Sequence, residues 1–514
     1  MRPLFILIFG FLIAACTSQQ SGPDIEKCSG SSGSEDEQIA ACARAIASGQ
    51  LSKENLAITY YNSGYAWSRK GDYDRAIADY NEAIVLNPQY SRAYSNRGYA
   101  WYQKGDYDQA ITDYNAAIRL NPRYAAAYSN RGYAWNQKGD YNRAIADYNE
   151  AIRLDPQDAV AYSNRGYTWS RKGDYDRAIA DYNEAIRLDP QDAVAYGNRG
   201  YTWSRKGDYV RSITDLNEAI RLDPRQAQAY NRRGIVWYEK RDFDQALADF
   251  NEAIRLDSRY AEAYYNRGRM WDGKRDYDRA IADYTEAIRL NPKDKESYNN
   301  RGVVWVLKSD YDRAIADYNE AIRLNPQYAL AYANRGYAWN GKGDYDQAIA
   351  DYDEAIRLNP KNAAVYYNRG YAQFYFGRFD ASAADFAESL HLNPNPYTVI
   401  GRYLAQSHTG SAKLAKNEFI ANSANLGKGI WPAPIIDLIA GRRDPAALLR
   451  AAEHPDPQTR SHHICEAEFY VGEWYVLNQR PKEARDMLQR AVQDCPRNFV
   501  EFEGAASELR RLSE

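Results

Sequence analysis

Small and aromatic residues recur along this chain with the spacing of a helix face. Within residues 125–158 two sets of such residues fall four and three positions apart: Tyr128, Gly132 and Trp135, and then Ala144, Tyr148 and Ala151. Spacings of three and four place side chains on one face of an α-helix. The pattern therefore predicts two amphipathic helices in this stretch, each of which buries one face against the other.

Helix breakers and capping residues separate the two predicted helices. Gly139 is typical of a left-handed helix end, and Asp140 is typical of the N-cap of the next helix. Pro156 prevents the second helix from continuing. The sequence therefore predicts a helix–turn–helix unit. Three later units replace the linker glycine, at Arg241, Arg275 and Ser309.

The unit returns with a fixed period. Glycines stand 34 residues apart at Gly64, Gly98, Gly132, Gly166, Gly200, Gly234, Gly268, Gly302, Gly336 and Gly370. A helix–turn–helix unit of this length resembles the tetratricopeptide repeat (TPR). Registered on that family, ten consecutive repeats span residues 57–396. Since one unit cannot bury its own Trp and Tyr, neighbours must stack. The resemblance implies an all-α TPR superhelical solenoid whose concave face is free to bind partners.

Two charged positions also recur in the repeats. Arginine stands at repeat position 7 in nine repeats and aspartate at position 23 in all ten, as in Arg131 and Asp147. The arginines would form either an anion-binding ladder or ion pairs with the aspartates of a facing helix. The matching counts favour ion pairs that stiffen the stack. Glu150 and Arg153 predict a surface pair that contributes only ~0.2–0.5 kcal/mol.

In this family the first helix of each repeat lines the concave groove, and positions 2, 5, 9, 12 and 13 point into it. Position 9 is tyrosine in seven repeats: Tyr65, Tyr99, Tyr133, Tyr167, Tyr201, Tyr337 and Tyr371. Tyr99, Tyr133, Tyr167 and Tyr201 are candidate partner-binding residues, because tyrosine offers rigid amphipathic contact area for peptides or sugars. Packing of the tyrosines against one another is the other interpretation. The family's asparagine clamp for a C-terminal carboxylate is absent here, so we expect no such clamp.

The eighth repeat has a more apolar groove than its neighbours. Its sequence "VVWVLK" places Val303, Val306 and Leu307 at groove positions, with Leu330 of the next repeat nearby. Exposed apolar clusters on a soluble protein mark contact sites. We expect these four residues to bind a partner.

The N-terminal residues predict export. Residues 1–15 combine Arg2 with an apolar run that is too short to span a bilayer. "IAAC" resembles the bacterial lipobox, which implies lipidation of Cys16 and, with Thr17 after it, an outer-membrane lipoprotein facing the periplasm. Cleavage by an ordinary signal peptidase is the alternative. Residues 16–34 are rich in Ser, Gly and Gln and predict a flexible tether.

The other cysteines form two local pairs in an exported chain, where disulfides are allowed. Cys28 and Cys42 would staple an N-terminal capping helix within residues 35–56. Cys465 and Cys495 fall at positions 1 and 31 of a degenerate TPR in residues 465–514, at the open ends of two antiparallel helices, where a disulfide fits. This pairing argues against a metal site at "HHIC", residues 462–465.

The remaining C-terminal sequence is helical but irregular over residues 397–464, and a last helix near 499–512 would cover the final apolar face. "EAEFYVGEWY" and "NFVEFEGAASELRRL" resemble the C-terminal part of NlpI-type outer-membrane TPR lipoproteins. That resemblance implies an adaptor for peptidoglycan hydrolases and their proteases, although the array here is much longer.

Charge and motifs limit the function further. The net charge is −3 with both signs interspersed, so nucleic acid is not an expected partner. The sequence has neither a Gly-rich phosphate loop nor a nucleophile elbow, and we predict no catalytic residue, cofactor or metal. The sequence therefore predicts a non-enzymatic scaffold, held at the membrane by lipid only, that binds envelope proteins. The alternatives are a peptidoglycan-binding module that uses the tyrosines and an enzyme within residues 397–464.

Overall fold

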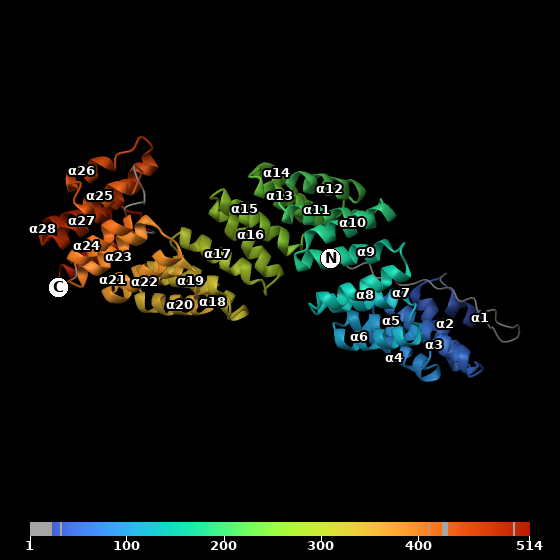
Figure 1. Ribbon diagram of the computed structural model, residues 1–514. Helices are drawn as coiled ribbons and strands as arrows, with labels where there is room; N and C mark the ends of the chain where they lie inside the picture. The colour runs from blue at the N-terminus through green and yellow to red at the C-terminus, as the bar shows by residue number, and fades with distance from the viewer. Residues whose placement is uncertain (1–22, 31–32, 411, 424–429, 497–498, 514) are drawn as a thin grey trace. The chain divides into compact units, whose positions relative to one another are not determined.

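The structure, a computed structural model, is helical without strands throughout the residues that it describes: 23–30, 33–410, 412–423, 430–496 and 499–513. The chain divides into two compact units, of which the first ends at Leu256 and the second begins at Asp257 (Figure 1). The predicted signal peptide, residues 1–15, and the predicted lipidation site, Cys16, lie outside the described residues.

The first unit contains two leading helices and then the helix pairs of repeats one to six. Its helices are α1 (Pro23–Ser29), α2 (Glu35–Ala47), α3 (Lys53–Lys70), α4 (Tyr73–Leu86), α5 (Ser91–Gln103), α6 (Tyr107–Leu120), α7 (Ala125–Gln137), α8 (Tyr141–Leu154), α9 (Ala159–Lys172), α10 (Tyr175–Leu188), α11 (Ala193–Arg205), α12 (Tyr209–Leu222), α13 (Ala227–Glu239) and α14 (Phe243–Leu256). Each pair also packs on the next pair within the unit.

The second unit contains repeats seven to ten and a C-terminal set of helices. Its helices are α15 (Ala261–Gly273), α16 (Tyr277–Leu290), α17 (Lys295–Leu307), α18 (Tyr311–Leu324), α19 (Ala329–Gly341), α20 (Tyr345–Leu358), α21 (Ala363–Tyr375), α22 (Phe379–Leu392), α23 (Pro396–His408), α24 (Ala412–Ser423), α25 (Ala433–Ala440), α26 (Pro445–Ala451), α27 (Pro457–Leu477), α28 (Pro481–Asp494) and α29 (Val500–Arg511).

The third repeat shows why these residues form a helix pair. Gly139 takes a φ of 79° between α7 and α8, and the Asp140 side chain accepts a hydrogen bond from the backbone N–H of Arg143. Gly132 lets the helices approach, because a Cβ there would lie 3.1 Å from the Ala144 carbonyl oxygen and 3.2 Å from the Tyr148 ring. The small residues at these positions therefore allow the two helices to pack closely.

The three repeats without a linker glycine keep the same turn. Arg241, Arg275 and Ser309 adopt φ angles of 63°, 60° and 60°. A residue with a Cβ pays roughly 1–2 kcal/mol in this conformation. The turn is therefore imposed by the helices on either side of it, at a local cost in stability.

The N-terminal segment differs from the prediction. Residues 23–29 form α1, which packs on α2 and α3, so the expected tether over 16–34 is wrong for this stretch. The structure pairs Cys28 with Cys42 at a Cα–Cα distance of 4.8 Å, and Asp24 accepts a 2.7 Å hydrogen bond from Arg44. These contacts order a segment whose composition alone indicates flexibility.

The C-terminal helices form a continuous apolar core. Residues of α23, α25, α27, α28 and α29 pack together with the end of α21, around buried side chains such as Ile400, Leu438 and Phe469. Helix α27 begins at Pro457, earlier than the predicted start of the degenerate repeat at Cys465. Gly472 faces Leu488 as Gly132 faces Tyr148, so α27 and α28 pack like a TPR pair.

Candidate functional site

The recurrent arginines and aspartates are paired inside the nine repeats that contain both, whereas in repeat one Ser63 donates to Asp79. Arg131 on α7 donates from Nε and Nη2 to the two carboxylate oxygens of Asp147 on α8, at 2.8 and 2.6 Å. Its Nη1 donates to the side-chain oxygen of Asn115 in the preceding repeat, at 2.6 Å. The Arg131 and Asp147 side chains are only 19% and 9% exposed. Ion pairing is therefore confirmed, and these arginines are not open to an anion.

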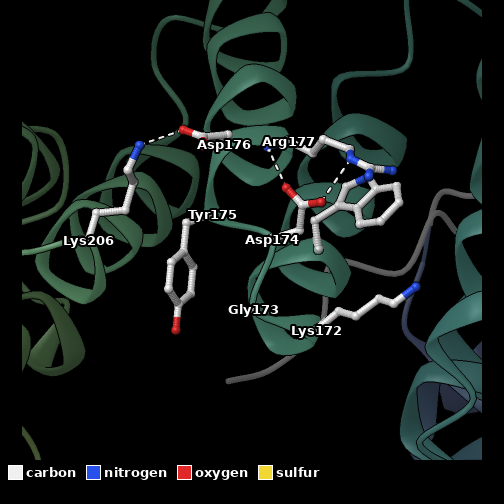
Figure 2. Close-up of a pocket in the computed structure, with 8 residues that line it drawn as sticks. Lys172, Gly173, Asp174, Tyr175, Asp176, Arg177 and Lys206 are labelled. Atoms are coloured by element: carbon white, nitrogen blue, oxygen red, sulfur yellow. Dashed lines mark hydrogen bonds and ion pairs between the residues drawn. The ribbon is translucent and has the colours of Figure 1, made fainter.

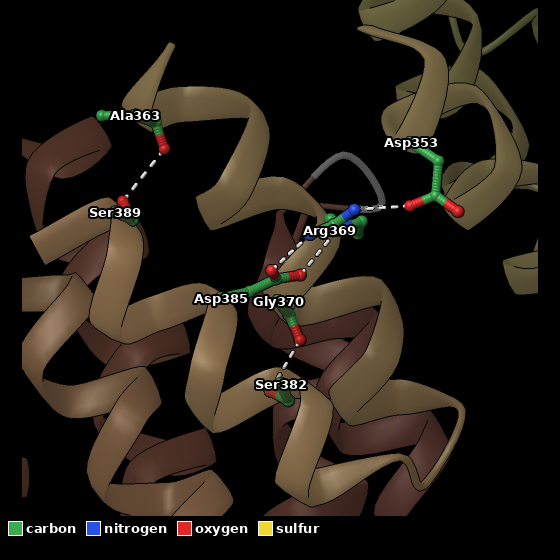
Figure 3. Close-up of polar contacts among 7 residues, drawn as sticks. All are labelled: Asp353, Ala363, Arg369, Gly370, Ser382, Asp385 and Ser389. Carbon is green, nitrogen blue, oxygen red and sulfur yellow. Dashed lines mark hydrogen bonds and ion pairs between the residues drawn. The ribbon is translucent and has the colours of Figure 1, made fainter. Parts of the chain in front are cut away.

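Repeat ten shows the same arrangement with one difference (Figure 3). Arg369 donates to both oxygens of Asp385, at 2.7 and 2.6 Å, and its Nη1 donates to Asp353, which replaces the usual asparagine. Burial raises the pKa of Asp385 above its ordinary value, although Arg369 acts in the opposite direction. Since these groups satisfy one another, the pairing has a structural role.

A hollow of about 470 Å³ lies at the turn between α9 and α10, and Lys206, just after α11, completes its lining. Figure 2 shows four of its charged groups paired: Lys206 contacts Asp176 at 2.5 Å, and Arg177 contacts Asp174 at 2.8 Å. Lys172 donates to the side-chain oxygen of Asn142 at 2.7 Å. Arg177 also lies 4.2 Å above the Trp169 ring. Lysine at position 14 contacts aspartate at position 18 of the preceding repeat in other pairs too, such as Lys342 and Asp312. This hollow therefore repeats a scaffold contact.

The eighth repeat contains an apolar pocket of about 220 Å³. We call it the repeat-eight pocket, and its lining residues are Val303, Val306 and Leu307 of α17, Tyr318 of α18, and Asn334 and Tyr337 of α19. Leu307 is 43% exposed at its rim, whereas Val306 is only 8% exposed. The three predicted residues of α17 thus meet at one pocket. Leu330 is 50% exposed but does not line it.

The candidate tyrosines at position 9 are partly covered by neighbouring side chains. The Tyr133 ring lies 5.2 Å from that of Tyr102 in the preceding repeat, and Tyr99 lies 6.5 Å from Tyr73. Tyr167 and Tyr201 are half-buried, and each lies within 3.4 Å of an arginine on its own helix. Packing between tyrosines is therefore confirmed for Tyr99 and Tyr133, whereas Tyr167 and Tyr201 contact arginines. In each of the four residues only part of the ring is exposed to a partner.

The groove positions of repeat ten are occupied by the chain itself. Tyr375 donates a 2.6 Å hydrogen bond to the Val500 carbonyl at the start of α29, and Ser507 donates a 2.7 Å bond back to the Tyr375 carbonyl. Arg511 donates to the Phe374 carbonyl at 3.0 Å. Tyr371 is left 2% exposed. The expectation of a free concave face is wrong at this repeat, because α29 fills it.

One cluster in the described chain has the residue types of a metal site. The ligand atoms of His408, Glu473 and Glu508 lie within 4.8 Å of one another. Arg511 forms an ion pair with Glu508, and His408 lies 3.3 Å from Glu473. One arginine and one protonated histidine balance the two carboxylates, so we interpret the cluster as an ion-pair network. Sequence reasoning missed it because its members stand on three separate helices.

The histidines that the sequence raised as half a metal site have other neighbours. His463 stacks on Trp431 with ring centroids 4.1 Å apart, and His462 lies 4.7 Å from Phe499. Cys465 is bonded to Cys495. These contacts account for the cysteine and for both rings.

The sequence also matches known family profiles. Tetratricopeptide repeat profiles match residues 61–118, 102–159, 159–192, 204–261, 231–294, 272–329, 340–375 and 363–396, which together are more than half of the chain. This chain is a tetratricopeptide repeat protein. Stacked TPR units form extended binding surfaces, so the TPR array is a scaffold for protein interaction. No curated protein sequence matches the chain.

Solved TPR structures resemble parts of this TPR protein. A TPR protein from Parabacteroides merdae is 20% identical, with 48% of this chain and 98% of that chain covered and a TM-score of 0.44. YrrB, described as a TPR protein with an unusual peptide-binding site, is 24% identical over 37% and 96%, with a TM-score of 0.31. Pseudomonas aeruginosa pilF is 20% identical over 39% and 92%, with a TM-score of 0.35. These scores are too low to support inferences about this protein's partners.

Proposed function

We propose that this TPR protein is a lipid-anchored, non-enzymatic scaffold of the bacterial envelope, and that it binds a protein partner at the repeat-eight pocket. The observation that carries the binding site is the pocket itself. Its aliphatic lining interrupts the row of tyrosines, and Leu307 presents an apolar side chain at its rim. A small apolar pocket with an exposed rim suits one anchoring side chain of a partner.

The proposed location rests on the N-terminal sequence. The lipobox-like "IAAC" supports lipidation of Cys16 and attachment to the outer membrane from the periplasmic side. None of the helices among the described residues is apolar over a length sufficient to cross a bilayer. The C-terminal resemblance to NlpI-type lipoproteins supports envelope proteins as partners, with peptidoglycan hydrolases or proteases as the first candidates.

Cross-linking capture from envelope extract tests the binding site. We expect Leu307→Asp to reduce recovery of the partner at least tenfold, because a carboxylate at the rim opposes burial of an apolar anchor. Val210→Asp is the matched control, since Val210 is 71% exposed on α12 of the first unit. Equal capture by both variants would exclude the pocket as the contact site, and capture of no protein by the wild type would refute the scaffold.

Metabolic labelling with an alkyne fatty acid tests the anchor. The wild type should take up the label and fractionate with outer membrane, and Cys16→Ser should do neither. If the wild type takes up no label, the lipid anchor is refuted and cleavage by an ordinary signal peptidase accounts for the N-terminal signal sequence. Retention on purified peptidoglycan that is lost in Tyr133→Ala/Tyr167→Ala would instead support the glycan-binding alternative, which no contact in the structure favours.

A further inference from the structure

Helix α29 reaches repeat ten with an unusual number of buried acids. Glu501 and Glu508 are 4% and 2% exposed, and Glu503 is half-buried beside Tyr345. Most of the polar contacts that attach α29 to α21 involve backbone carbonyls and do not neutralise these acids. We propose that α29 is a proton-controlled cover over the inner face of repeat ten, closed at mildly acidic pH and released as the pH rises.

Glu501 carries the largest part of this inference. The titratable groups that face it are Tyr337 on α19, Tyr367, Tyr371 and Tyr375 on α21, Tyr397 on α23, and Glu466 and Tyr470 on α27. None of these groups is a cation. The Tyr470 hydroxyl lies 3.4 Å from the carboxylate and is a weak donor at that distance. Among the residues that the structure describes, an ionised Glu501 would therefore be a buried charge without a counter-charge.

Glu466 adds to the cost of ionising Glu501. Its carboxylate accepts hydrogen bonds from the Tyr397 hydroxyl and the Trp431 indole N–H, both at 2.9 Å. Burial raises the pKa of Glu501 to about 8, and the nearby carboxylate of Glu466 raises it in the same direction. Burial also raises the pKa of Glu466. At neutral pH the protein therefore holds Glu501 protonated.

The other end of α29 depends on protons in the same direction. Burial and the charge of Glu473 raise the pKa of Glu508 to about 7, although Arg511 and His408 oppose this. Burial lowers the pKa of His408, but its contacts with Glu473 and Glu508 outweigh burial and raise the pKa overall. Loss of the His408 proton would leave two buried carboxylates to share Arg511.

The glutamate in the middle of α29, Glu503, also has a raised pKa. Glu503 lies 3.2 Å from the Tyr345 hydroxyl at the start of α20, and Arg510 lies 3.4 Å from the same hydroxyl. Burial raises the pKa of Glu503, and the charge of Arg510 only partly offsets this. On α28, Arg485 donates a hydrogen bond to the Leu512 carbonyl. The pKa values of Glu501, Glu503 and Glu508 on α29, and of His408 against it, are thus all raised, so these groups bind protons more tightly when α29 is docked.

The direction of the pH effect follows from these shifts. A glutamate with a raised pKa contributes full docking stability below its ordinary pKa of ~4.3, and loses it as the pH rises to the docked value. The docking stability that Glu508 and Glu501 contribute is therefore lost completely only when the pH reaches their docked pKa values of about 7 and about 8. Each proton released on undocking shifts the equilibrium about tenfold per pH unit. Release would expose Tyr371 and Tyr375, in the same unit as the repeat-eight pocket.

Hydrogen exchange in the full-length chain tests the proposal, with rates corrected for the intrinsic effect of pH and with α8 as the internal reference. We expect protection of residues 500–511 to fall about tenfold per pH unit or more between pH 6 and 8 in the wild type. Glu501→Gln should lose protection of α29 less steeply with pH than the wild type, because glutamine resembles the protonated acid and removes one of the proton-releasing groups. Glu320→Gln on α18 should behave as wild type, since Glu320 is a surface partner of Arg323.

Two results would overturn the proposal. One is constant corrected protection of α29 from pH 6 to 8 in the wild type. The other is a loss of protection in Glu501→Gln as steep as that in the wild type. If Glu501→Gln lowers the helix content, Glu508→Gln provides the second variant, and an unchanged slope in that variant would also refute the proposal. The proposal is independent of what binds the repeat-eight pocket.

Discussion

Two glycines of helix α11 should respond to alanine with opposite signs. A Cβ added at Gly200 would lie 2.9 Å from Cγ of Leu216 and 3.1 Å from the Ser212 carbonyl oxygen on α12. The backbone oxygen cannot move without shifting α12. A Cβ at Gly197, three residues earlier, would meet nothing closer than 3.5 Å, and its nearest neighbours include the flexible ends of Arg232 and Gln226.

The magnitudes follow from competition between helix propensity and packing. Alanine in a helix interior gains ~0.5–1 kcal/mol over glycine. Forcing a methyl group into a packed interface costs ~1–3 kcal/mol. We therefore expect Gly197→Ala to stabilise the protein by about 0.5 kcal/mol or more, and Gly200→Ala to destabilise it by about 1–2 kcal/mol. The two variants share helix and residue change, so the difference between them isolates the helix contact.

Urea unfolding followed by far-ultraviolet circular dichroism measures the difference, with a constant m-value as the check that the same structure unfolds. Because repeat arrays can unfold in parts, hydrogen exchange in α11 and α12 should assign the change to this repeat. The cost of Gly200→Ala should also shrink when Leu216 is replaced by alanine. A Gly200→Ala variant as stable as Gly197→Ala would refute the close-packing explanation of the period.

Three further comparisons test other contacts. Arg131→Met should cost about 3 kcal/mol in urea unfolding, because it leaves the buried Asp partner unpaired, whereas Arg153→Met should cost less than ~0.5 kcal/mol. Arg241→Gly should raise the unfolding midpoint by relieving about 1 kcal/mol of backbone strain at its positive φ. Removing the Cys465–Cys495 bond, which spans 30 residues, should cost about 3–4 kcal/mol, measured as a fall in thermal midpoint between oxidised protein and the double-alanine variant.

The sequence predicts the repeats well because their contacts are local and recur. Gly132 and Tyr148 belong to one helix pair, and the pairing of Arg131 with Asp147 follows from two positions with matching counts. The turn at Gly139 depends only on its own backbone. Each of these features involves residues of one 34-residue repeat and recurs in the other repeats, so the sequence pattern alone is sufficient to predict it.

Contacts between distant segments could not be predicted in this way. Tyr375 and Val500 are 125 residues apart, and nothing in the 34-residue period indicates that α29 fills repeat ten. Tyr371 therefore matched the tyrosine row in sequence but is buried in the structure. Helix α1 is ordered by its contacts with α2 and α3, and residue composition alone does not reveal these contacts. The contacts of the lysines at position 14 were predictable, since an aspartate recurs at position 18 in most repeats, although Asn142 and Val210 replace it in two of them.

The bond from each arginine to the preceding repeat has a consequence for how this gene can change. Arg165 reaches back to Asn149 at 2.6 Å, and Arg199 reaches back to Asn183 at 2.7 Å. Deletion of residues 159–192 would bring Asn149 opposite Arg199 and restore the same junction. An in-frame gain or loss of 34 codons here therefore keeps the arginine–asparagine bond across the new junction, so recombination can lengthen or shorten the array without loss of this contact.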